Sequence, residues 1–160
     1  MLKICKENWA RYSENLKTRL REEYKTLKNT ICYKDLVRFA IDEILNVNGD
    51  KKQLIWNVVN EEAVTKIDDG DYQGTLLFIV PKHTYQPSSY EYLITYIEYG
   101  SCCCCDALEG ALDYSYGGGD AFENVIDGLM TICQDIIFNI KRPFYDKYVY
   151  AKDDNWAEVE

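Results

Sequence analysis

Several features are scarce in this chain of 160 residues, and each shortage excludes a class of function. It has one histidine, so it cannot build a site that needs two imidazoles. It has no apolar run near the roughly 18 residues that suggest a membrane span. The opening stretch MLKICKENWARY holds no apolar segment of the length found in secretory signals. We therefore expect neither a membrane protein nor a secreted one.

Positive charge is missing from much of the second half, because no Lys or Arg occurs between Lys82 and Lys141. Residues 1–34 carry a net charge of +5, whereas the remainder carries −14 and the whole chain −9. A negative field repels nucleic acid and attracts basic surfaces. Direct nucleic-acid contact is therefore expected only through the basic N-terminal helix. We predict that an acidic surface binds a basic protein partner through Glu91, Glu98, Asp106, Glu109, Asp113, Asp120, Glu123 and Asp127.

The first part of the chain predicts helices. Apolar residues recur every three or four positions over 4–30 and again over 34–46, which is typical of amphipathic helices. The second helix is expected to end at Asn48-Gly49, and 52–60 weakly favours a short helix. The apolar stripe of 4–30 must be buried, so we favour a helix that packs on the body with its cations facing the acidic surface. The alternative is an arm that binds RNA or DNA.

The middle of the chain predicts a sheet. Three stretches are rich in strand-forming residues and are separated by turn signals, which indicates an antiparallel meander: 63–67, 75–80 and 90–99. The capping-box spacing of Asp106 and Glu109 predicts a short helix after it. A stripe from Phe122 to Ile140 predicts a last long helix that ends at Arg142-Pro143.

These elements predict the α+β class, with a three-stranded antiparallel meander packed against helices and a long amphipathic N-terminal helix. We expect one domain in three parts. They are a helical N-terminal arm over 1–47, an α+β core over 48–145 and a C-terminal tail over 146–160.

Two motifs carry a family resemblance. The stretch DGDYQGTLLF at 69–78 and the stretch YGS-Cys102-x-x-Cys105-Asp at 99–106 resemble small uncharacterised proteins of tailed bacteriophages and prophages. The likeness covers about 65–140 and includes Leu129-Met130-Thr131. It implies expression in the cytoplasm of a bacterial host. Together with the long interval without Lys or Arg between Lys82 and Lys141, this origin leads us to predict a phage accessory protein that is not an enzyme. Such a protein would bind a host protein, for example to inhibit a nucleic-acid-handling defence enzyme. The alternative within this family is a structural virion component.

The seven cysteines leave a second function open. Cys102 and Cys105 have the C-x-x-C spacing of redox motifs and of half a zinc site. A zinc site would also need Cys32, Cys133 or His83 to converge on them. In the phage proteins that these motifs resemble, the two residues between this pair are usually small, where this chain has cysteines. We favour the interpretation that the cysteines are small packing residues, with no cofactor, and keep a thiol-redox or zinc protein as the alternative.

Overall fold

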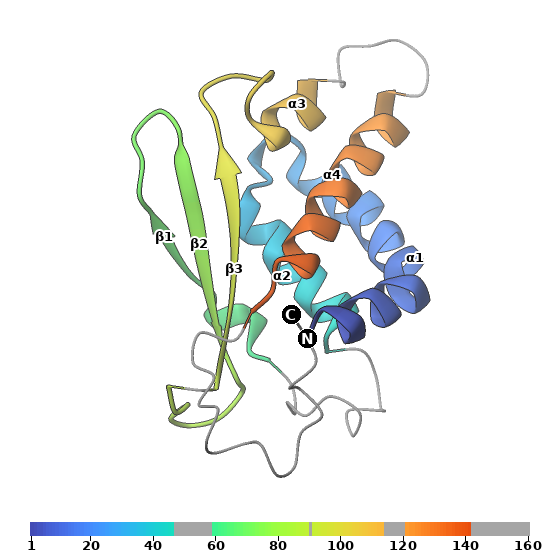
Figure 1. Cartoon of the computed structure of the whole chain (residues 1–160). Helices are drawn as coiled ribbons and strands as arrows, with labels where there is room; N and C mark the ends of the chain where they lie inside the picture. Colours follow the sequence, from blue (N-terminus) through green and yellow to red (C-terminus); the bar gives the residue numbers. More distant parts are fainter. Residues whose placement is uncertain (47–58, 90, 114–120, 142–160) are drawn as a thin grey trace.

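A helical layer covers one face of a small sheet (Figure 1). The computed structural model describes residues 1–46, 59–89, 91–113 and 121–141. The elements run in the order α1 (Leu2–Leu27), α2 (Tyr33–Ile44), β1 (Thr65–Asp68), β2 (Gly74–Pro81), β3 (Tyr92–Tyr99), α3 (Ala107–Asp113) and α4 (Ala121–Phe138). Short 3-10 turns occupy Lys28–Thr30 and Glu61–Ala63. The predicted α+β class and the long N-terminal helix are confirmed.

Helix α2 packs against both α1 and α4, which also contact each other. Its apolar residues are almost completely buried: Leu36, Val37, Ala40, Ile41 and Ile44. Helix α1 contributes a stripe that includes Leu16 and Leu20, as its periodicity predicts. It ends at Leu27 rather than at 30, because the backbone of Lys28 turns to a φ of 43°. The N-terminal helices thus share one hydrophobic core with α4 and the sheet.

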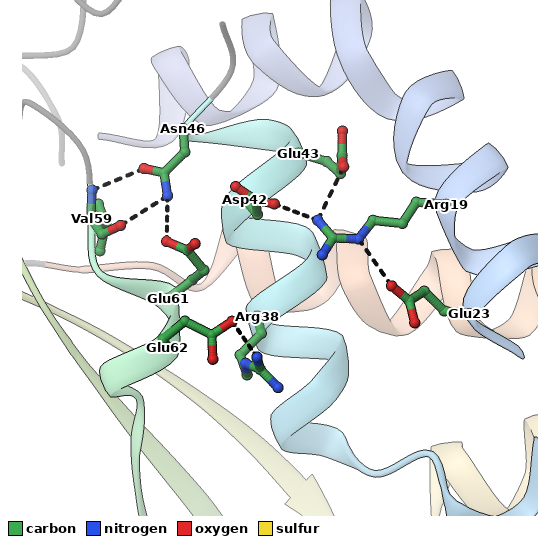
Figure 2. Close-up of polar contacts among 9 residues, drawn as sticks. All are labelled: Arg19, Glu23, Arg38, Asp42, Glu43, Asn46, Val59, Glu61 and Glu62. Carbon is green, nitrogen blue, oxygen red and sulfur yellow. Dashed lines mark hydrogen bonds and ion pairs between the residues drawn. The ribbon is translucent and has the colours of Figure 1, made fainter. Parts of the chain in front are cut away.

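Polar contacts fasten α2 to its surroundings (Figure 2). The Arg19 guanidinium on α1 binds the carboxylates of Asp42 and Glu43 on α2. At the end of α2, the Asn46 side chain both donates to the carbonyl of Val59 (2.8 Å) and accepts from its N–H (2.9 Å). Asn46 therefore ties the helix to the segment that leads into the sheet. The expected cap at 48–49 and residues 52–58 of the expected helix over 52–60 lie outside the described residues. At its end the helix prediction is wrong, because Val59 pairs with Lys82 in an isolated β-bridge.

The sheet has the strand order β1-β2-β3 and is antiparallel throughout, so the predicted meander is confirmed. Side chains alternate between its faces. Leu76, Phe78 and Val80 on β2 are buried on the face toward the helices. The intervening Leu77 and Ile79 are only half-buried on the opposite face. The central strand is thus apolar on both faces, and the helical layer covers one of them.

Helix α4 ends at Phe138, four residues before the predicted stop at Arg142-Pro143. The reason is a strand-like pairing just beyond it. The N–H and C=O of Lys141 exchange two hydrogen bonds of 2.8 Å with Ile94 on β3, which requires an extended backbone. The predicted tail over 146–160 lies outside the described residues. In the described ranges, no helix combines the length and apolar character that spanning a membrane takes.

Candidate protein-binding groove

Two residues of the predicted acidic surface are neutralised by helix α1. Arg21 binds Glu123 through two hydrogen bonds of 3.0 and 2.8 Å. Lys17 contacts Asp127 at 2.6 Å. The Arg21 guanidinium lowers the pKa of the Glu123 carboxyl, as expected for a bidentate charged pair. The expectation that the cations of this helix complement the acidic surface is confirmed, and the picture of an uncompensated negative patch is corrected for Glu123 and Asp127.

Glu91 is also occupied within the chain. Its carboxylate accepts the N–H of Ser88 (3.0 Å) and binds the ammonium of Lys82 (3.0 Å). The Ser88 N–H is the main reason that the pKa of Glu91 is lowered, and Lys82 acts in the same direction. Glu91 therefore stabilises the connection between β2 and β3. Asp120, another predicted partner-binding residue, lies outside the described residues.

Asp106 is a structural residue, which corrects its predicted place on the partner-binding surface. Its side chain is buried, and Oδ1 accepts the hydroxyl of Tyr33 (2.9 Å) and the N–H of Glu109 (2.8 Å). The Tyr33 hydroxyl in turn accepts the N–H of Leu108 (3.0 Å). The spacing of Asp106 and Glu109 thus correctly predicted an N-terminal cap for α3. A carboxylate held in this way cannot contact a partner.

This network predicts a distinctive alkaline response. Burial, followed by the Asp106 carboxylate, raises the pKa of Tyr33 above its ordinary value of about 10. A raised folded-state pKa contributes stability that is complete below the unfolded value and is lost as the pH rises through the folded one. We expect the free energy of unfolding to fall less steeply above about pH 10 in Tyr33→Phe than in the wild type. Urea unfolding across this range measures both slopes.

The matched control is Tyr85→Phe, which removes the hydroxyl of a ring that is 98% exposed. Its slope should equal that of the wild type. An unchanged slope in Tyr33→Phe would mean that the Tyr33 hydroxyl makes no such contribution.

Three of the predicted residues keep free carboxylates. Glu98, Glu109 and Asp113 are exposed, and within the described ranges no ion pair involves them. Asp135 on α4 is in the same condition, although it was not among the predicted binding residues. The acidic surface is therefore smaller than predicted.

Glu98 and Asp135 lie on a groove between β3 and the helices. The groove has a volume of about 320 Å³ and is lined by Tyr96, Ile97, Glu98, Ala107, Ile132, Asp135 and Asn139. A second hollow of about 380 Å³ also includes Glu98, and its lining is completed by Gln73, Gly74, Thr75, Tyr99, Gly100 and Cys105. Glu98 lines both hollows, which therefore adjoin at this residue of β3.

The groove lies along the outer edge of β3, where some backbone N–H and C=O groups are not paired with another strand of the described residues. Ile94 pairs outward with Lys141, so its N–H and C=O point away from β2. These groups alternate sides along an antiparallel strand, and those of Tyr96 and Glu98 therefore also point outward. In the part of the chain that the structure describes, no strand pairs with them. An unpaired edge of this kind is a template for another extended chain.

Sequence reasoning missed Asp135, and the signal that points to it becomes visible only once the end of α4 is known. Asp135 lies in the last turn of α4, at the negative end of the helix dipole, and that turn contains no basic residue. A carboxylate is unfavourable at that end of a helix. Because α4 ends at Phe138, Asp135 does not stabilise this helix, which makes it a candidate for a role in binding.

The cysteines and His83 do not gather into one site. Among the described residues, no group of three or more His, Cys, Asp or Glu side chains is placed to hold a metal ion. The Cys133 thiol is buried and faces the carbonyl of Leu36, while the Cys32 thiol donates to Asp35. His83 follows the end of β2 opposite to the end near Cys105. The zinc alternative therefore obtains no further ligand from the candidates that the sequence offered.

Cys102 and Cys105 are exposed, as are the two cysteines between them. This differs from the interpretation that they are buried packing residues. The Sγ atoms of Cys102 and Cys105 lie 2.9 Å apart.

Comparisons of the chain with protein-family models, curated proteins and solved structures give no match. The evidence on function therefore comes from the residues of the groove.

Proposed function

We propose that this protein is a binding protein, not an enzyme, that captures an extended basic segment of a partner along the free edge of β3. The observation that carries the proposal is the coincidence of this edge with two exposed carboxylates, Glu98 and Asp135, on one groove. In β-strand addition, backbone hydrogen bonds supply affinity and flanking side chains supply selectivity. Here the flanking charges select Lys and Arg.

The charge distribution supports a basic partner over a nucleic acid. Lys17, Arg19 and Arg21, three cations of the basic helix, are already bound to carboxylates of this chain. The groove carries carboxylates, which repel phosphate. A protein segment rich in Lys and Arg suits both facts.

We further propose that the partner is a host protein and that the protein acts as a phage accessory factor in the bacterial cytoplasm. The motif resemblance at 69–78 and 99–106 supports this origin. Enzymes that handle nucleic acid present Lys and Arg to phosphates. A defence enzyme whose basic segment is held in the groove would lose part of its contact with nucleic acid, which is how binding would inhibit it.

The decisive test uses a labelled peptide of about eight residues in which Lys and Val alternate, a length typical of a strand. We expect salt-sensitive binding in fluorescence anisotropy. Glu98→Lys and Asp135→Lys should each weaken binding at least about tenfold, because each places a like charge against the peptide. Glu109→Lys and Asp113→Lys make the same charge change on α3 outside the groove lining and serve as matched controls.

Two further peptides separate the contributions of backbone and charge. Methylation of alternate backbone nitrogens should abolish binding while the charges remain, and replacement of Lys by Glu should abolish it while the backbone remains. Equal loss of affinity in the groove and control variants would contradict the proposed site. Tighter binding of a single-stranded oligonucleotide than of the basic peptide would favour nucleic acid as the partner instead.

A further inference from the structure

The segment that follows β3 brings two thiols together in a tight turn. The N–H groups of Cys105 and Asp106 both donate to the carbonyl of Cys102, at 2.9 and 2.8 Å. A hydrogen bond between the first and fourth residues of a turn keeps their Cα atoms within about 7 Å. Most protein disulfides span a similar distance or slightly less. The turn thus places Cys102 and Cys105 where they can be bridged without moving a strand or a helix.

The absence of a side chain on Gly100 leaves room for the Cys105 side chain. A Cβ atom on Gly100 would lie 2.4 Å from the Cys105 Sγ and 2.5 Å from the Cys105 carbonyl oxygen. Any other residue here would therefore collide with both the thiol and the backbone of Cys105. The position of this thiol beside Cys102 depends on a glycine at the end of β3.

We propose that Cys102 and Cys105 form a reversible dithiol–disulfide pair that exchanges electrons with disulfides of small thiols or of partner proteins. The proposal stands apart from peptide binding in the groove. It rests on the Sγ–Sγ distance of 2.9 Å, on the exposure of both residues and on the turn that joins them.

The two thiols have different roles in the exchange. The Cys105 thiol lies 2.9 Å from the Cys102 sulfur and, followed by the N–H groups of Cys104 and Cys105, lowers the pKa of Cys102, which favours Cys102 as the attacking thiolate. Its sulfur attacks a disulfide RS–SR, forms a mixed disulfide and releases RS⁻. Cys105 loses its proton and attacks the Cys102 sulfur, which expels the second RS⁻. Overall, the protein dithiol loses two electrons and two protons, and RS–SR becomes two RSH.

Four of the other five cysteines are poorly suited to this chemistry. Burial raises the pKa of Cys133, and it raises that of Cys5 to about 11. Burial also raises the pKa of Cys32. The pKa of Cys103 is raised because it lies beside Cys104 and near the carboxylate of Asp113. Within the contiguous cysteines, the contact between the Cys102 and Cys105 sulfurs distinguishes this pair.

The test equilibrates the full reduced protein with mixtures of reduced and oxidised glutathione, followed by acid quenching and intact mass spectrometry. We expect one internal disulfide, seen as the loss of two hydrogen atoms. Cys102→Ser and Cys105→Ser should each lose it. Because the four cysteines are contiguous, connectivity is read from such variants rather than from proteolytic fragments. Cys103→Ser and Cys104→Ser are the matched controls and should retain the internal bond.

The roles of the two thiols are tested by the trapped intermediate. Cys105→Ser should accumulate glutathione on Cys102, because the second attack is no longer available. Circular dichroism of each variant verifies that the fold is retained. The proposal is overturned if no internal disulfide forms in the folded wild type, or if the bond survives in Cys105→Ser and is lost in Cys104→Ser.

Discussion

Replacement of Asp106 by alanine should lower the free energy of unfolding by about 3 kcal/mol. Asp106 is only 7% exposed, and its carboxylate accepts hydrogen bonds from two partners. It caps α3 through the N–H of Glu109, and it accepts the hydroxyl of Tyr33 from the start of α2. Alanine removes the cap, which costs about 1 kcal/mol. It also leaves the buried hydroxyl of Tyr33 without its acceptor, which costs a further 1–3 kcal/mol, roughly.

The informative control is Asp106→Asn. Asparagine caps helices about as well as aspartate, and its carbonyl oxygen can accept both hydrogen bonds. We expect it to lose much less stability than alanine in urea unfolding. Glu109→Ala is a second control, because only the backbone N–H of Glu109 takes part in the cap. Equal losses in Asp106→Asn and Asp106→Ala would show that the charge, rather than the acceptor geometry, stabilises this junction.

Asp106 shows which contacts can be predicted from the sequence and which cannot. The spacing to Glu109 is local, and it predicted the cap correctly. The partner hydroxyl comes from Tyr33, which is 73 residues away in the chain. No periodicity or spacing encodes a contact of that range, because it depends on how α2 packs against the rest of the core. An exposed acidic residue and a buried one therefore looked alike in the sequence.

The charge pattern was informative in the same limited way. The excess of cations in 1–34 and of carboxylates after Lys82 predicted that helix α1 would face acidic residues. It did not predict which carboxylates α1 would neutralise, since this depends on α4 lying beside α1. The pairing of Arg21 with Glu123 and of Lys17 with Asp127 is a result of that packing.

The groove was the least predictable feature. The strands of the meander were predicted from their composition, and Glu98 was among the predicted binding residues. The open edge at Tyr96 and Glu98 depends on where Lys141 pairs with β3, and the sequence had indicated helix up to that point. The competing effect was tertiary: pairing with β3 outweighed the helical periodicity that continues to Ile140.

Replacement of Thr95 by valine should lower the free energy of unfolding by about 2 kcal/mol, because it leaves the buried carbonyl of Ile136 without its hydrogen-bond donor. Thr95 is 1% exposed, and its hydroxyl donates to the carbonyl of Ile136 at 2.8 Å. Ile136 belongs to the last turn of α4, whose carbonyls have no full set of partners within the helix. Valine has nearly the same shape but no donor, so the packing remains and the hydrogen bond is lost.

Thr95→Ser is the matched control, since it retains the donor and removes only a methyl group, at a cost of about 1 kcal/mol. Urea unfolding should therefore rank valine below serine. The same bond holds the end of α4 against β3, and Asp135 lies one residue before Ile136. If the groove binds basic segments, folded Thr95→Val should also bind the Lys-Val peptide more weakly than Thr95→Ser. A valine variant as stable as the wild type would mean that this hydroxyl does not anchor α4 to the sheet.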